Sequence, residues 1–233
     1  MLKAEFVKKD IKKLADPSRA KILRRFFKTG PGEYGEGDIF LGVTVPQQRL
    51  VVKRYLAMPL SEVVKLLHSR EHEYRFSALI LLVEKYKKGD EELKEKIFKI
   101  YLANLKYANS WDLVDSSAPY ISGDFLLKRD RQGLKKLAKS DNLWERRVAM
   151  LSTYAFIRQN DFKLALSLAT IFLDDEHSLM HKASGWMLRE IGKRDKEVLL
   201  DFLKLSAKRM PRIMLSYATE RMTKKEKEIF SLR

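Results

Sequence analysis

Four side chains able to bind charged groups fall at related positions in this sequence. Trp111 and Asp115 are four residues apart, a spacing that puts both on one face of a helix. Arg147 follows Trp111 by 36 residues, and Trp186 lies about one helical turn past residue 183, the next position at that interval. A carboxylate and indole faces attract positive charge, and a guanidinium binds phosphate through two parallel hydrogen bonds. Together these residues predict a binding site for charged groups.

Each of these side chains also fits a structural role. The two tryptophans could belong to the core, where aromatic residues usually pack. Asp115 could cap a helix, although Asp112 is better placed to do so, and Arg147 could pair on the surface with Glu145 or Glu190. The spacing of about 36 residues that relates Trp111, Arg147 and the region of Trp186 favours one shared site over four separate structural roles.

The interval of 36 residues runs through much of the chain. It separates Arg75, Trp111, Arg147 and Ala183, and a similar helical segment surrounds each of them. A period of about 34–47 residues is typical of two-helix repeats, which bury their apolar faces by stacking on their neighbours. The sequence therefore predicts an all-α, helical-repeat curved solenoid, a single domain over residues 1–233 whose concave face carries residues of equal phase.

Helical periodicity supports this fold along nearly the whole chain. Apolar residues recur at helix-face spacing, as in Phe76, Leu79, Ile80 and Val83, and no segment shows the sustained alternation of a strand. Asp16-Pro17, Val45-Pro46 and Met210-Pro211 mark helix starts, since proline is favoured at the first helical position. The predicted helices cover residues 2–15, 17–28, 46–57, 59–68, 72–87, 90–105, 110–120, 130–138, 142–159, 161–173, 178–193, 195–204, 211–221 and 223–231.

Composition narrows the class of protein and its partners. The 233 residues include 47 Lys and Arg but 31 Asp and Glu, so the net charge is +16, with a pI of about 9.8. Such a basic domain is typical of nucleic-acid binders. Cysteine is absent, which excludes disulfides and cysteine nucleophiles. The charged N-terminal segment does not resemble a secretory signal, and the weakly charged stretch Leu164–Leu173 is too short to span a membrane, so we expect a cytoplasmic protein.

Two further motifs have weaker functional interpretations. The segment Gly30–Phe40 holds four of the ten glycines, but it lacks the Gly-Lys-Ser/Thr ending of a phosphate-binding loop and is predicted to be a flexible connection, with Tyr34 at its tip. His68 and His72 match the H-x-x-E-H spacing of some zinc peptidases. That segment is predicted to join two helices, whereas a zinc site needs one continuous helix and a third ligand, so we expect no metal.

Six stretches of the chain form a recognisable pattern when taken together and in order. They are GVTVPQQR (42–49), EYRFSALILLVEKY (73–86), SWDLVDSSAPYISGDFLL (110–127), SDNLWERRVAMLSTYAFI (140–157), HKASGWMLREIGKRD (181–195) and MPRIMLSYATERM (210–222). They resemble the AlkD-type DNA alkylation repair glycosylases. The resemblance covers residues 42–222 and implies a HEAT-like repeat fold that wraps duplex DNA and excises positively charged N3- and N7-alkylated purines.

The resemblance also implies roles for individual residues. The functional Trp, Asp, Arg and Trp of the family match Trp111, Asp115, Arg147 and Trp186. Asp115 would stabilise the sugar cation and orient water, the two indoles would pack against the lesion nucleotide, and Arg147 would hold a phosphate. Further basic side chains are candidates for DNA contacts: Arg146, Lys182, Arg189, Lys193 and Arg212.

The sequence thus predicts a glycosylase that acts on duplex DNA as a monomer, without a metal, an organic cofactor or a membrane. With no lysine identified as a Schiff-base nucleophile, we expect base removal without strand cleavage. A second hypothesis is a non-catalytic HEAT-like repeat module that binds nucleic acid or an acidic protein. The two hypotheses differ in what they expect of Asp115.

Overall fold

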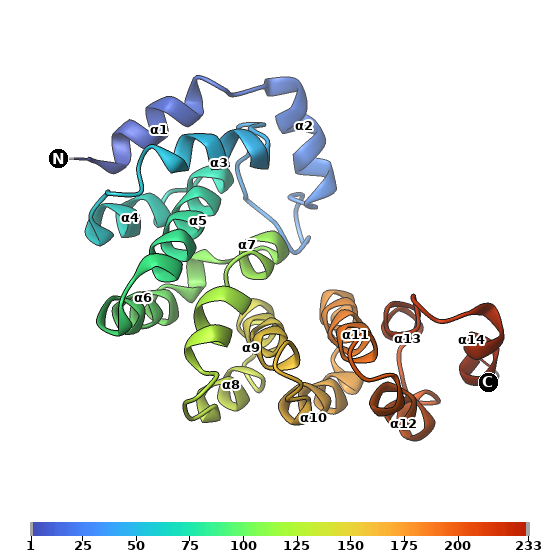
Figure 1. Cartoon of the computed structure of the whole chain (residues 1–233). Coiled ribbons are helices and arrows are strands. Elements are labelled where there is room, and N and C mark those ends of the chain that lie inside the picture. Colours follow the sequence, from blue (N-terminus) through green and yellow to red (C-terminus); the bar gives the residue numbers. More distant parts are fainter. Residues whose placement is uncertain (1, 232–233) are drawn as a thin grey trace. The chain divides into compact units, whose positions relative to one another are not determined.

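The computed structural model describes residues 2–231, which form helices joined by loops (Figure 1). Within this range no β-strand occurs, and the sole extended pairing is an isolated bridge between Ile39 and Glu71. The predicted all-α, helical-repeat fold is confirmed. The chain divides into two compact units between Ser117 and Ala118, and the prediction of one domain over residues 1–233 stays a prediction.

The first unit is built around its longest helix. Its α-helices are α1 (Ala4–Lys12), α2 (Pro17–Phe26), α3 (Val45–Lys53), α4 (Leu60–Leu67), α5 (His72–Lys88), α6 (Glu91–Ala103) and α7 (Trp111–Asp115), with a 3-10 helix η1 (Leu105–Tyr107). Helix α5 is buried on nearly all sides and packs against α1, α3, α4, α6 and α7. The polar side chains in its first half, His72, Glu73, Arg75 and Ser77, are therefore inside the unit, where each needs a partner.

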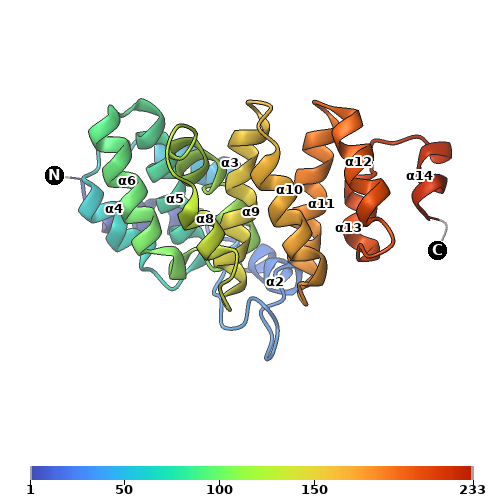
Figure 2. The same ribbon diagram turned by 90° about the horizontal axis from the view of Figure 1, so that it is seen from below.

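The second unit consists of two rows of helices. Its elements are the π-helix η2 (Pro119–Gly123), α8 (Gln132–Leu137), α9 (Leu143–Ile157), α10 (Lys163–Ile171), the 3-10 helix η3 (Phe172–Asp174), α11 (Ser178–Gly192), α12 (Lys196–Ser206), α13 (Arg212–Ala218) and α14 (Lys224–Ser231). Helix α9 lies between η2 and α11, and α11 lies between α9 and α13. Helices α8, α10 and α12 form the second row against them (Figures 1 and 2). This is the stacking that the repeat predicts.

Side-chain caps fix several helix starts. Asp16 accepts hydrogen bonds from the backbone N–H groups of Ser18 and Arg19, both at 3.0 Å, and Pro17 is the first residue of α2 as predicted. Such caps satisfy N–H groups that the helix itself leaves without partners. Other caps of this kind are Asp90 for α6, Asn142 for α9 and Asp195 for α12.

The predicted helix 110–120 is wrong in its second half. Helix α7 ends at Asp115, turns follow, and the chain resumes as a π-helix at Pro119. The hydroxyls of Ser116 and Ser117 donate to the carbonyl oxygens of Asp112 and Leu113, both at 2.6 Å, and such back-bonding competes with helix continuation. Pro119 also has no N–H to donate to the carbonyl oxygen of Asp115, so an α-helix through it would lose that hydrogen bond. Elsewhere the predicted ranges agree with the observed bounds within a few residues.

Candidate active site

Trp111 begins α7 and stands at the end of an aromatic stack. Its ring is parallel to that of Phe27, with centroids 5.3 Å apart and an interplanar angle of 12°. Phe27 in turn stacks on Phe40 at 4.9 Å, and Phe26 meets Trp111 edge-on at 6.0 Å. The indole is half-buried, so one part packs in the unit and another faces solvent. The stack fixes the plane of the indole.

Asp115 lies one turn after Trp111 on the same short helix. Its side chain is half-buried, neither enclosed in the core nor fully exposed. The carboxylate is near enough to Tyr101 that its charge, together with burial as the main cause, raises the pKa of that phenol. Tyr101 and the hydroxyl of Ser117 are 3.0 Å apart beneath the helix. The structure therefore presents an indole and a carboxylate together on α7.

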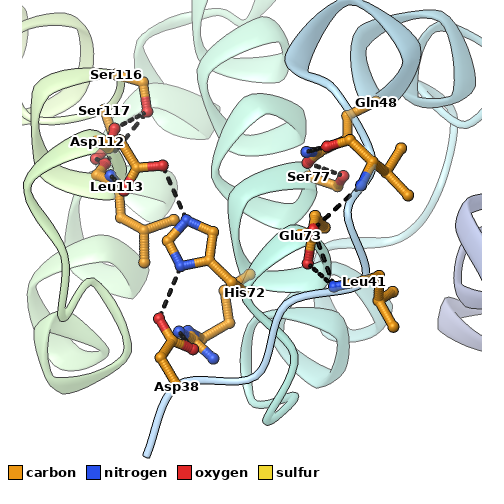
Figure 3. A network of polar contacts seen from close by, with 12 residues as sticks. Asp38, Leu41, Gln48, His72, Glu73, Ser77, Asp112, Leu113, Ser116 and Ser117 are labelled. Carbon is orange, nitrogen blue, oxygen red and sulfur yellow. Dashed lines mark hydrogen bonds and ion pairs between the residues drawn. The ribbon is translucent and has the colours of Figure 1, made fainter. Parts of the chain in front are cut away.

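Between these two residues, Asp112 belongs to a buried charge cluster, the His72 cluster, formed by Asp38, His72, Arg75 and Asp112. Figure 3 shows Asp38, His72 and Asp112 of this cluster. The Nδ1 atom of His72 is 2.8 Å from Asp38 Oδ2, and its Nε2 atom is 2.8 Å from Asp112 Oδ2. Arg75 Nη2 donates to the other oxygen of Asp38 at 2.7 Å. The side chains of Asp38, His72 and Arg75 are at most 5% exposed. Two carboxylates thus face two cationic groups.

The charges of this cluster depend on one another. Burial by itself lowers the pKa of His72, but the charge of Asp112 and hydrogen bonds to both carboxylates raise it to about 9. Burial likewise opposes ionisation of Asp38, yet the hydrogen bond from His72 and the charges of His72 and Arg75 lower the pKa of that carboxyl. His72 is therefore an imidazolium at neutral pH.

The same end of α5 anchors the segment that follows Gly30. The backbone N–H of His72 donates to the carbonyl of Ile39 at 2.8 Å. The buried carboxylate of Glu73 accepts the N–H groups of residues 41, 42 and 43 at 2.7–3.2 Å. Figure 3 shows Glu73 beside Leu41. Gly42 has a φ of +84°, and a Cβ there would come within 2.1 Å of the Asp16 carbonyl oxygen. The predicted flexible connection thus ends in a segment held by many hydrogen bonds.

In the second unit, Arg147 and Trp186 are placed differently from each other. Arg147 on α9 is buried, with 4% exposure, and not on the surface, and its Nη1 donates to the carbonyl oxygen of Leu179 at 2.6 Å. Trp186 on α11 is half-buried, and its indole N–H donates to Glu190 at 3.0 Å. The ring of Tyr154 lies 6.4 Å away at a tilt of 38°. Trp186 is oriented by a hydrogen bond, in contrast to the stacked Trp111.

An open pocket of about 450 Å³ lies where α9 and α11 end. It is mostly polar, and three of its residues are basic. A pocket with this lining suits an anion such as phosphate better than an apolar ligand. The lining residues are Tyr154, Arg158, Asn160, Glu190, Lys193 and Arg194.

The predicted DNA-contact residues fall into two groups. Arg146 pairs with Asp175 at 2.8 Å, Arg189 with Glu220, and Lys193 with Glu190 at 2.6 Å. In the described part of the chain, neither the half-buried Lys182 nor the exposed Arg212 forms an ion pair. These two can offer all their donors to a ligand, whereas the first three must exchange a carboxylate for it.

The histidines of the zinc-like motif serve other purposes. His68 follows the last residue of α4, where it lies 2.6 Å from the side-chain oxygen of Asn104, while His72 begins α5. The motif therefore joins two helices, as predicted. Across residues 2–231 no three His, Asp or Glu side chains are arranged to hold a metal ion. Every helix in that range is also too short or too polar to cross a lipid bilayer.

Sequence reasoning misses the His72 cluster and the aromatic stack. It places His72 only in a metal-like motif, gives Asp112 a capping role and does not single out Asp38. The adjacent Phe26 and Phe27 just before a glycine-rich segment are a weak signal of an aromatic platform. The partners lie 34–40 residues apart, so no local pattern pairs them.

Comparisons with known proteins give a family and a similar fold. A model of the family described as "DNA alkylation repair enzyme" matches residues 7–222. A solved structure described as "Predicted DNA alkylation repair enzyme from Enterococcus faecalis" is similar, with a TM-score of 0.69 and 17% identity. The match covers 90% of this chain and 97% of that one, and at this identity it shows the fold alone. No curated protein matches the chain.

Proposed function

The chain belongs to the DNA alkylation repair enzyme family, and from that premise we propose that it is a DNA glycosylase. Its role is in DNA repair, and DNA is its partner. We propose that it hydrolyses the N-glycosidic bond of positively charged N3- or N7-alkylated purines in duplex DNA, acting as a monomer. The observation that carries the proposal is the presence of an indole and a carboxylate, both half-buried, on the short helix α7.

The chemistry of these lesions explains why one carboxylate is enough. An N3- or N7-alkylated purine carries a positive charge, so it leaves as a neutral base and needs no general acid. O-glycosidases, which must protonate the leaving group, use two carboxyl groups. As the bond stretches, positive charge moves to the deoxyribose, and water adds at its anomeric carbon. Asp115 stabilises that charge and orients the water, and the added water loses its proton to solvent or to this carboxylate.

The two tryptophans make a smaller contribution to binding the cationic nucleotide. Each presents part of its ring to solvent, and the face of an indole attracts a cation by about 0.5–2 kcal/mol. This attraction favours a cationic base and sugar over neutral ones. Stacking on Phe27 and the hydrogen bond to Glu190 hold Trp111 and Trp186 in their orientations before DNA arrives. A fixed ring loses less conformational entropy on binding.

The experiment uses purified chain and methylated duplex DNA, with chromatography of the released bases. Asp115→Asn is expected to abolish release of 7-methylguanine while DNA affinity stays nearly unchanged, because the amide has no negative charge to stabilise the sugar cation. The matched control is Asp201→Asn on α12, an exposed carboxylate paired with Lys204, which should release at the wild-type rate. Strand breaks should appear only after alkali treatment.

Three results would contradict the proposal. Unchanged release by Asp115→Asn removes this carboxylate from the mechanism. Strand cleavage without alkali would require a lyase step that the proposal excludes. A wild-type chain that binds DNA but releases no base would be the non-catalytic repeat module of the second hypothesis.

Arg147 tests the phosphate-binding part of the proposal. We propose that its guanidinium, which donates from Nη1 to the Leu179 carbonyl, also contacts a phosphate beside the lesion. Arg147→Ala is expected to weaken DNA binding and to lower the slope of log affinity against log salt concentration by about 1. Arg209→Ala, which removes an exposed arginine paired with Asp174, is the control. An unaltered slope for Arg147→Ala would refute the phosphate contact.

A further inference from the structure

Helix α7 carries both Trp111 and Asp115, yet it has little ability to hold its own shape. It is five residues long, and its N-cap residue, Ser110, makes no side-chain capping bond. A single helical turn is unstable by itself, because nucleation costs more than one turn of hydrogen bonds returns. The direction in which its side chains point must therefore come from contacts outside the helix.

His72 makes a charged hydrogen bond to Asp112 on α7. Both ring nitrogens of His72 face carboxylates, Asp38 on one side and Asp112 on the other, each at 2.8 Å (Figure 3). A carboxylate accepts hydrogen bonds, so two such partners require a proton on each nitrogen. The ring is therefore an imidazolium that links the 38–40 segment to α7 through its two N–H groups.

The charged groups that face this ring come from three elements. Asp38 belongs to the segment after α2, Asp112 belongs to α7, and Arg75 reaches Asp38 from the helix of His72 itself. Helix α5 also carries Glu73, whose carboxylate is taken up by backbone N–H groups of residues 41–43. The charges of two carboxylates, one imidazolium and one guanidinium balance.

Aromatic contacts extend the same link to Trp111. The ring of Phe40 stacks on His72 with centroids 4.4 Å apart, and Phe27 lies 5.1 Å from His72 while stacking on Trp111. His72 thus touches the carboxylate next to Trp111 along the chain and the ring beneath Trp111 in space. A change in its charge or shape acts on both supports of the indole.

We propose that His72 is a positioning residue: its bond to Asp112 and its contacts with Phe27 and Phe40 hold α7 so that Trp111 and Asp115 meet the DNA in a working orientation. It touches no reacting atom. The proposal rests on the glycosylase function only for its effect on rate. The proposal also says that the charge of His72 sets the position of Trp111, and this can be tested without measuring activity.

The first test measures the single-turnover rate of 7-methylguanine release at saturating protein. His72→Gln keeps one hydrogen bond but loses the charge, and Asp112→Asn keeps the imidazole but removes its partner. Each is expected to slow release at least tenfold with less than a threefold change in DNA affinity, and the double variant should be no slower than either single one. His68→Gln, whose imidazole contacts Asn104 instead, should release at the wild-type rate.

The second test needs no activity. In ¹⁵N-labelled full-length protein the three tryptophan indole signals are assigned by single Trp→Phe variants. The Trp111 signal should shift as pH rises through the titration of His72 near 9, while that of Trp144 stays in place, and Asp112→Asn should move the shift to lower pH. Circular dichroism shows whether His72→Gln folds. If it does not, the titration of the wild-type protein still tests the link between His72 and Trp111.

The outcomes separate the two proposals. A folded His72→Gln with the wild-type rate, or a Trp111 signal that ignores the titration of His72, overturns the positioning role. Absence of base release from the wild type would contradict the glycosylase function. The titration of the Trp111 indole signal would then decide the role of His72. A loss of thermal stability with an unchanged single-turnover rate would mean that the cluster only stabilises the fold.

Discussion

Each of the two units has a histidine at the start of a long helix, next to an aspartate and an arginine; His72 in the first unit is buried and His177 in the second is half-buried. In the first unit His72 begins α5 beside Asp38 and Arg75. In the second unit His177 is the N-cap of α11, and nearby Asp175 pairs with Arg146 at 2.8 Å. We call this second group the His177 cluster.

The two histidines differ in charge at neutral pH: His72 is cationic and His177 is neutral. His177 Nδ1 accepts the backbone N–H of Leu179 at 3.1 Å, which requires an unprotonated nitrogen. Burial is the main cause that lowers the pKa of His177; Asp175 opposes the shift, and Arg146 and Arg147 add to it. His72 has two carboxylates and a raised pKa of about 9. Burial lowers the pKa of both histidines, so the comparison teaches that contact with two carboxylates, as in His72, is what overcomes burial here.

The difference extends to the tryptophan near each cluster. Trp111 stands on a short helix that is tied to the His72 cluster through the adjacent Asp112, so its position is linked to a titratable charge. Trp186 lies in the middle of the fifteen-residue α11 and takes its orientation from Glu190 on the same helix. A long helix carries its side chains without such help, whereas a single turn does not.

The largest expected effect comes from removing the imidazolium. The folded-state pKa of about 9 lies above the usual 6.5, so its stabilisation is complete below pH 6.5 and is lost as pH rises through 9. His72→Gln should therefore lower the free energy of unfolding by about 3 kcal/mol at pH 6 and by much less at pH 10. Urea unfolding at the two pH values measures this, and an equal loss at both would mean that His72 is neutral.

Breaking the His177 cluster at its carboxylate should cost less. Asp175→Asn leaves Arg146, whose side chain is 18% exposed, without its counter-charge. Because a hydrogen-bonding amide remains and solvent reaches part of the guanidinium, we expect a loss of about 2 kcal/mol. The same urea experiment at pH 7 checks it, with Asp201→Asn as the exposed control. A loss below that of the control would show that the ion pair contributes nothing.

Removing His177 should show the opposite pH dependence to His72. Its lowered folded-state pKa means that the wild type loses stability as pH falls below 6.5, because the unfolded chain binds the proton more readily. At pH 8, His177→Ala should cost about 1 kcal/mol, as expected for a lost helix cap. At pH 5 the cost should shrink, since the protonated wild-type ring can no longer accept from Leu179. A cost that grows in acid would contradict the neutral assignment.

The smallest effect concerns two arginines and DNA. Arg212→Ala removes an exposed guanidinium that has no ion pair within residues 2–231. The salt slope of DNA binding should therefore fall by about 1, while stability changes by less than about 0.5 kcal/mol. Arg146→Ala should lower stability more and the salt slope less, because Asp175 already occupies its guanidinium. Fluorescence titrations at several salt concentrations measure both slopes. The reverse order would place the DNA contact at Arg146.

Much of the fold could be predicted because its signals are local. The 36-residue interval, apolar spacing and proline-marked starts locate helices such as α2, α5 and α9 within a few residues. The prediction fails where a long helix is expected over 110–120, since serine hydroxyls and Pro119 end it after one turn. The four-residue spacing of Trp111 and Asp115 predicts that they share one helix face, and both residues do lie on that short helix.

By itself, the sequence determined the helical repeat, the positive charge, the family and the residue types at the candidate site. Only the tertiary structure decided which groups share a charge: that His72 joins Asp38 and Asp112, that Arg147 is buried against Leu179, and that Trp111 rests on Phe27. The physical reason is range. Helix periodicity acts over three or four residues and is written in local spacing, whereas burial and charge pairing depend on groups tens of residues apart that meet only after the chain has folded.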